Sequence, residues 1–173
     1  MPRIAKRSSK VPHYEVAPGL LAYEWIEVVS TPADNLPYAV TALIEPEGGR
    51  YVVRKLVAER VPDGLPVQRG ELAKISVEPF IREAAREVMQ VTGPGEWRPI
   101  SPTPDFWDRI DDGSGLSEED LPQLAMLYRW IKLQDGRPTT ILARDLKMST
   151  ATVRRWLARA VEAGHMSQEE RTR

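Results

Sequence analysis

Between residues 139 and 164, small and apolar residues recur at intervals that few pairs of short helices satisfy. Two helices that cross at a sharp angle need a small side chain where they meet and apolar side chains one turn apart for a shared core. Counted from Thr139, the small residue Ala143 is fifth, and Lys147 stands ninth, where glycine is common because φ is positive there. The fourth, eighth, tenth, fifteenth and eighteenth places are apolar: Leu142, Leu146, Met148, Val153 and Trp156. This register is typical of the helix-turn-helix that binds DNA.

The residues that flank this register predict where three helices begin. The first begins after the acidic run 117–120, whose charge suits the positive end of a helix dipole. The second is capped by Thr139 or by Thr140. The third covers 149–163 and has Ser149 as its N-cap. We therefore expect a helical domain in the last third of the chain.

Positive charge concentrates in the same stretch. The whole chain has a net charge of −1, but residues 137–159 contain six lysines and arginines against Asp145 alone. A polyanion responds to this local charge rather than to the total, so double-stranded DNA is the expected partner. We predict DNA contacts from ten residues: Arg137, Thr139, Lys147, Ser149, Thr150, Ala151, Thr152, Arg154, Arg155 and Arg159.

The side chains of the third helix suggest how the contacts divide. Hydroxyls at 149–152 suit phosphate or base edges, and Ala151 is small enough to approach a thymine methyl. Arg154 or Arg155 has the length and geometry to reach a guanine, whereas Arg159 is expected at a phosphate. Trp156 is expected in the core rather than on a base.

A longer set of residues carries a family resemblance: Pro138, Thr139, Leu142, Ala143, Ser149, Thr152, Trp156, Leu157, Ala160 and Gly164. With this pattern, the C-terminal quarter of the chain resembles the C-terminal helix-turn-helix of small actinobacterial and actinophage proteins. His165 departs from the apolar residue that usually closes the pattern. The resemblance implies a DNA-binding protein, without implying which DNA sequence it reads.

The N-terminal half reads as strands followed by a helix. Runs of β-branched and aromatic residues predict strands at 21–29, 38–45 and 50–61, and the pair Gly48-Gly49 predicts a hairpin between the last two. An apolar stripe predicts one helix over 71–91. The expected fold class is α+β, with a small N-terminal antiparallel sheet and a helix, followed by a C-terminal three-helix domain with a helix-turn-helix.

Composition divides the chain into five expected segments. These are a basic flexible arm (1–12), an α+β domain for dimerisation or partner binding (13–91), a Pro/Gly-rich linker (92–116), the helix-turn-helix domain (117–166) and a tail (167–173). The arm either enters a minor groove or is an ordinary solvated terminus. Residues 105–120 contain seven acids and one arginine, and we call them the acidic segment. The acidic segment either covers the basic helix when DNA is absent or is a solvated linker.

The sequence lacks most of the residues and motifs that enzymes, metal sites and membrane anchors require. The chain has no cysteine, and its two histidines, His13 and His165, are far apart. No glycine-rich phosphate loop and no metal-ligand spacing occur, so we expect no enzyme, no cofactor and no metal. No apolar run approaches the roughly 18 residues of a membrane span, and the N-terminus lacks the apolar core of a secretory signal. A cytoplasmic, nucleoid-associated protein of a bacterium or phage is expected.

The sequence therefore predicts a sequence-specific DNA-binding protein that regulates transcription and reads the major groove with helix 149–163. One small helix-turn-helix contacts few base pairs, so a homodimer is expected, with strand 50–61 as a candidate edge. Two alternatives remain. One is a phage or host adaptor whose N-terminal domain binds a protein partner, and the other is an architectural or partition-type DNA binder.

Overall fold

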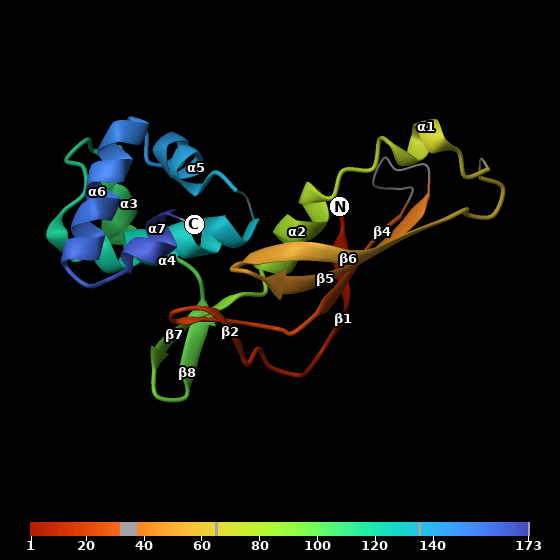
Figure 1. Cartoon of the computed structure of the whole chain (residues 1–173), viewed down its shortest axis with the longest axis horizontal. Coiled ribbons are helices and arrows are strands. Elements are labelled where there is room, and N and C mark those ends of the chain that lie inside the picture. The colour runs from red at the N-terminus through yellow and green to blue at the C-terminus, as the bar shows by residue number, and fades with distance from the viewer. Residues whose placement is uncertain (32–37, 65, 135, 173) are drawn as a thin grey trace. The chain divides into compact units, whose positions relative to one another are not determined.

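The computed structural model describes the chain except for residues 32–37, 65, 135 and 173 (Figure 1). Its internal contacts divide the chain into two compact units, Met1–Pro99 and Ile100–Arg173. The first unit contains two antiparallel sheets, and the second is helical. The α+β class with a helical C-terminal part is thus confirmed. No helix in the described part of the chain is long and apolar enough to cross a membrane.

The larger sheet has the order β1-β4-β5-β6. Its strands are β1 (Arg3–Arg7), β4 (Ile26–Ser30), β5 (Ala39–Glu47) and β6 (Arg50–Glu59). β5 and β6 form the predicted hairpin, in which Glu47 pairs with Arg50. Gly48 and Gly49 make the turn at φ values of 58° and 75°, a conformation that costs glycine little. β1 and β6 are the two edges of this sheet.

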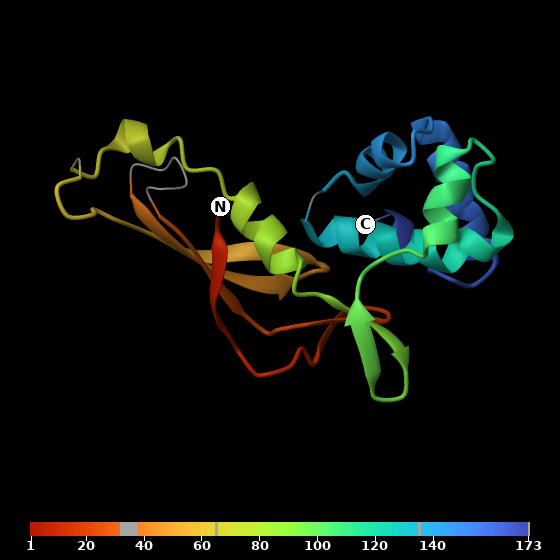
Figure 2. The same ribbon diagram turned by 180° about the vertical axis from the view of Figure 1, so that it is seen from behind.

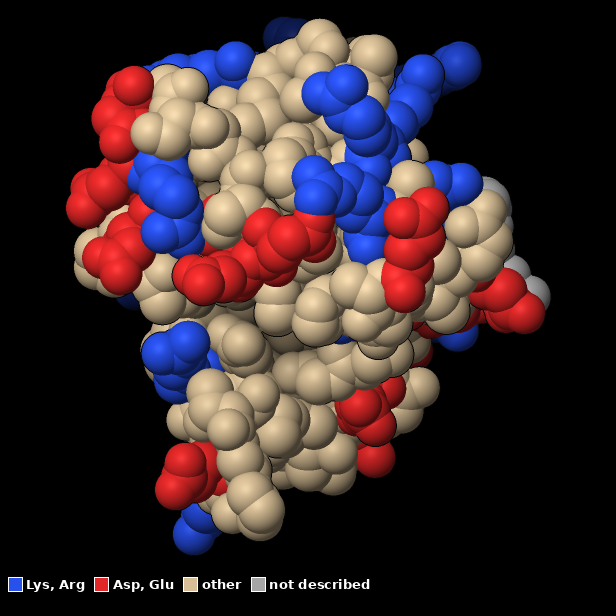
Figure 3. All heavy atoms as spheres, turned by 90° about the vertical axis from the view of Figure 1, so that its left-hand side faces the viewer, with Lys and Arg blue, Asp and Glu red and all other residues tan. Residues whose placement is uncertain are grey.

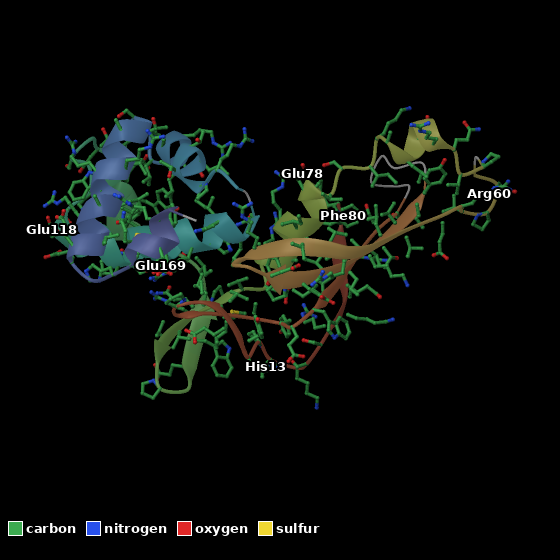
Figure 4. All side chains as sticks on the ribbon, in the orientation of Figure 1. His13, Arg60, Glu78, Phe80, Glu118 and Glu169 are labelled. Atoms are coloured by element: carbon green, nitrogen blue, oxygen red, sulfur yellow. The ribbon has the colours of Figure 1, made fainter. Side chains whose placement is uncertain are left out.

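The helix predicted over 71–91 is wrong in its extent. The segment instead forms α1 (Arg69–Leu72), α2 (Glu78–Ala85) and the start of β7 (Met89–Gly93). Pro79 lies in the first turn of α2, where its missing N–H removes no bond. Phe80 and Ala84 of α2 are buried, and α2 contacts all four strands of the larger sheet (Figure 4). Beyond Ala85 the chain leaves the helix because its backbone pairs with β3.

The smaller sheet was not predicted. It has the order β2-β3-β7-β8, with β2 (Tyr14–Ala17), β3 (Leu20–Ala22), β7 (Met89–Gly93) and β8 (Glu96–Pro99). Leu21 pairs with Met89, so the sheet joins segments that are far apart in the sequence. The expected linker 92–116 therefore contains the end of β7, all of β8 and a further helix, α3.

The expected basic arm is also ordered. β1 pairs with β4, with Arg3 opposite Val29, so the N-terminal residues are an edge strand rather than a flexible arm. Arg7 forms an ion pair with Glu87 at 2.7 Å, and its guanidinium lies 5.7 Å from the centre of the Tyr23 ring. Backbone pairing with β4 and these side-chain contacts hold β1 in place. The amino-acid composition of residues 1–12, from which a flexible arm was predicted, does not reveal such contacts.

The described residues of the helical unit form six helical elements. They are α3 (Pro104–Asp111), the 3-10 turn η2 (Glu118–Asp120), α4 (Leu121–Gln134), α5 (Pro138–Asp145), α6 (Thr150–Glu162) and α7 (Gln168–Thr172). The helices α4, α5 and α6 contact one another pairwise around a core that includes Leu124, Leu142 and Leu157. α3 lies beside α6 in both views (Figures 1 and 2).

Residues 167–173 were expected to be a tail, but they include α7, which is fastened to α4. Arg129 of α4 donates to Glu170 at 2.6 Å and to the His165 carbonyl at 2.8 Å. Tyr128 also donates, to the carbonyl of Arg171 at 3.2 Å. Burial opposes ionisation of Glu170, but the hydrogen bonds from Arg129 and Ser167, together with the Arg129 charge, outweigh it and lower the pKa of that carboxyl.

Candidate nucleic-acid interface

The turn between α5 and α6 is closed by backbone hydrogen bonds. The N–H of Lys147 donates to the Arg144 carbonyl at 3.2 Å, and that of Met148 donates to the Ala143 carbonyl at 2.9 Å. This pair of bonds is a Schellman motif, which requires a left-handed residue just after the helix. Lys147 takes that conformation, with a φ of 53°. The ninth place of the register therefore has the backbone that glycine usually provides, at some cost in strain.

The same motif ends α6, but with the usual residue. Gly164 has a φ of 77°, its N–H donates to Val161, and the His165 N–H donates to Ala160 at 2.9 Å. Gly164 as the stop of this helix was predicted from the sequence and is confirmed.

The first turn of α6 is capped as predicted. Ser149 has extended backbone angles, and its hydroxyl accepts a hydrogen bond from the Thr152 N–H at 3.0 Å. The hydroxyls of Ser149 and Thr152 lie 2.9 Å apart, so two of the hydroxyls expected at DNA are occupied by the cap. The predicted cap of α5 is wrong. α5 begins at Pro138, which places Thr139 and Thr140 inside its first turn.

The inner face of the α5–α6 pair is apolar. Ala143 is buried where the helices meet, and the shared core includes Leu142, Leu146, Val153, Leu157 and Ala160. Met148 and Trp156 are only half-buried, so the expectation that Trp156 is a core residue is wrong. Leu157 takes the buried place, and the Arg159 guanidinium lies 4.3 Å from the centre of the Trp156 ring.

The outer face of α6 contains the predicted contact residues. Five of them are exposed along it: Thr150, Ala151, Arg154, Arg155 and Arg159. Ser149 and Lys147 are exposed just before the helix, and Arg137 is exposed just before α5. Thr139 and Thr152 are half-buried. The fold therefore brings most of these residues to one helix and the turn before it, with Arg137 and Thr139 at the start of the neighbouring helix.

Acidic side chains adjoin this face. Lys147 Nζ lies 2.7 Å from an Asp111 carboxylate oxygen, and Arg159 forms an ion pair with Glu118. In Figure 3, basic and acidic atoms alternate on the face of the helical unit rather than forming one basic patch. Within the described residues, Arg154 and Arg155 are the arginines of α6 that have no ion pair.

A buried carboxylate holds the acidic segment in position. Asp120 is fully buried, accepts from the Ser117 N–H at 2.8 Å and its hydroxyl at 2.9 Å, and also binds Arg109. Burial opposes its ionisation, but the hydrogen bonds from Arg109 and Ser117 outweigh that and lower the pKa of Asp120. The sequence offered one signal for this residue, because a serine three places before an acid is the pattern of a capping box.

No group of three or more histidines, cysteines or acids in the described ranges has the arrangement of a metal site. Compared with family models, curated proteins and solved structures, the chain matches none of them.

Proposed function

We propose that the protein binds double-stranded DNA through a helix-turn-helix formed by α5 and α6, with α6 in the major groove. One observation carries this proposal. Arg154 and Arg155 are exposed on the outer face of α6, while Val153, Leu157 and Ala160 anchor its inner face in the core. A helix held in this way presents a rigid basic surface, and the major groove is wide enough to admit it.

The proposed contacts follow from the positions of the side chains. Thr150, Ala151, Arg154 and Arg155 face base edges, because they occupy the first two turns of the outer face. Ser149 and Thr152 mainly position the helix, since their hydroxyls already close its first turn. The remaining candidates serve phosphates: Arg137, Thr139, Lys147 and Arg159.

We further propose a transcriptional regulator that acts as a homodimer, because a single unit of this size reads too few base pairs to be selective. β6 supports this proposal as an edge strand of the larger sheet. The resemblance to actinobacterial and phage proteins favours the same class.

The test is the double variant R154A/R155A, measured by fluorescence anisotropy on mixed-sequence duplex DNA over a range of salt. We expect affinity to fall by about 5-fold or more for each arginine, since a bidentate contact of arginine with a base is worth about 1–3 kcal/mol. The slope of log affinity against log salt should change by less than about one per arginine, because Arg154 and Arg155 are assigned to base edges rather than to phosphates.

The matched control is R82A/R86A, which removes two exposed arginines, Arg82 in α2 and Arg86 directly after it. Equal affinity and equal slope for R154A/R155A and the wild type would contradict the proposal. Affinity that depends on these arginines but not on DNA sequence, measured by site selection, would favour the architectural alternative.

The adaptor alternative is supported by a separate observation. The register of the smaller sheet places Val91 and Trp97 opposite each other on one face, and they are 40% and 44% exposed. Apolar side chains that adjoin each other on a surface mark protein contacts, whereas single exposed ones are ordinary. If R154A/R155A left the binding of duplex DNA unchanged, the result would favour the adaptor alternative, with this face of the smaller sheet as the candidate protein contact.

A further inference from the structure

We propose that the acidic segment competes with DNA for the basic residues beside α6, so that Asp111 and Glu118 hold Lys147 and Arg159 until phosphates replace them. This inference rests on the proposed function. The competition would regulate the same surface. Arg154 and Arg155 could bind DNA at once, whereas Lys147 and Arg159 must first lose their carboxylate partners.

The two ion pairs lie toward opposite ends of α6. Lys147 precedes the helix and pairs with Asp111, the last residue of α3, whereas Arg159 lies in its last turn and pairs with Glu118. From Thr150 to Arg159 the helix rises by roughly 14 Å. Between the two pairs, the segment stays close to the turn, since a Cβ placed on Gly115 would lie 3.9 Å from Met148 Cε. Figure 4 shows Glu118 beside α6.

The acids are fixed in this position by buried neighbours. Phe106, Ile110 and Leu116 are buried, and Asp120 binds Ser117 and Arg109. Glu118 is two residues from this anchor, in the same 3-10 turn. A solvated acidic linker would have neither the anchor nor the two ion pairs, so the structure favours the other interpretation of the acidic segment.

The pairs are nevertheless easy to exchange. The side chains of Lys147 and Asp111 are 69% and 66% exposed, and exposed pairs contribute little because water and salt screen them. Arg159 and Glu118 are also exposed. A DNA phosphate has the charge to replace either carboxylate. Asp111 and Glu118 would then remain close to the DNA backbone as repelling charges, which lowers affinity further.

The experiment compares D111N/E118Q with D105N/D108N. The control removes the same charge from the same segment, but neither of its acids pairs with Lys147 or Arg159 in the described structure. Binding to mixed-sequence duplex DNA is measured by anisotropy between about 50 and 200 mM salt, where phosphate contacts change affinity most clearly. Thermal unfolding checks that all variants remain folded.

We expect D111N/E118Q to bind about 2- to 30-fold more tightly than the wild type at low salt, because each of the two exposed pairs is worth about 0.2–1 kcal/mol. Its salt slope should change by less than one, since the same phosphates are contacted in the end. D105N/D108N should gain about 2-fold or less, through the general loss of negative charge.

Two failures are distinguishable. Loss of binding in R154A/R155A, together with equal affinities for D111N/E118Q and D105N/D108N, would overturn the competition alone. Unchanged binding in R154A/R155A would overturn the proposed function, and the competition with it, because α6 would not be the DNA surface.

Discussion

The helical unit contains two groups of carboxylates that form ion pairs of different kinds. Around Asp120 and Glu170, carboxylates are buried or partly buried, accept several hydrogen bonds and join elements to each other. Beside α6, Asp111 and Glu118 form single contacts in water. Removing a carboxylate from the first group leaves donors without acceptors, whereas removing one from the second exposes a cation to solvent. The number of bonds and the burial, rather than the charge, separate a structural ion pair from an exchangeable one.

The largest effect is expected for Asp120→Asn. The amide replaces an oxygen that accepts from Ser117 or Arg109 with a donor, so hydrogen bonds are lost in a buried place. We expect the free energy of unfolding to fall by about 2 kcal/mol, which denaturant titration measures. Asp108→Asn is the control on an exposed acid of the same segment. If Asp120→Asn lowered the free energy of unfolding by less than about 0.5 kcal/mol, burial would not distinguish the structural carboxylates from the exchangeable ones.

Acid should reveal the same difference. The pKa values of Asp120 and Glu170 are lowered in the folded state, so the unfolded chain takes up protons first as pH falls. Their contribution to stability is present above the unfolded pKa values of about 4 and is lost as pH falls through the folded values. We expect stability to decline below about pH 4, and to decline less steeply in Asp120→Asn. Parallel pH curves for the two proteins would contradict this assignment.

The smallest effect is expected at the two helix ends. Lys147→Gly removes an exposed ion pair but places glycine at a φ of 53°, where it is less strained than lysine. We expect the free energy of unfolding to rise by about 0.5 kcal/mol. Gly164→Ala, at the corresponding place after α6, should lower it by about 1 kcal/mol. A clear loss of stability in Lys147→Gly would show that the Asp111 pair contributes more than its exposure suggests.

Some features could be predicted because their causes are local. Gly48 and Gly49 favour a tight turn, Ser149 can reach the N–H of Thr152, and Gly164 suits a left-handed helix end. Each depends on residues within four places of one another. The predicted hairpin and the predicted ends of α6 are confirmed for that reason.

Other features required contacts across the chain. The smaller sheet depends on β3 meeting β7, and β1 is ordered because β4 lies beside it. The helix predicted over 71–91 stops at Ala85 because β3 offers a pairing edge there. Proline and glycine in 92–116 suggested a linker, but they serve the turn of a hairpin and the start of α3.

The sequence by itself determined the register of apolar and small residues over 139–164 and the arginines on its outer face, since helical periodicity alone separates the two faces. Only the tertiary structure decided that, among the residues it describes, Lys147 and Arg159 have an ion pair whereas Arg154 and Arg155 have none. The partners of these cations are 36 and 41 residues away in the sequence, and only the folding of α3 and η2 against α6 brings them close. Charge composition can be counted from a sequence, but pairing depends on distances that the fold sets.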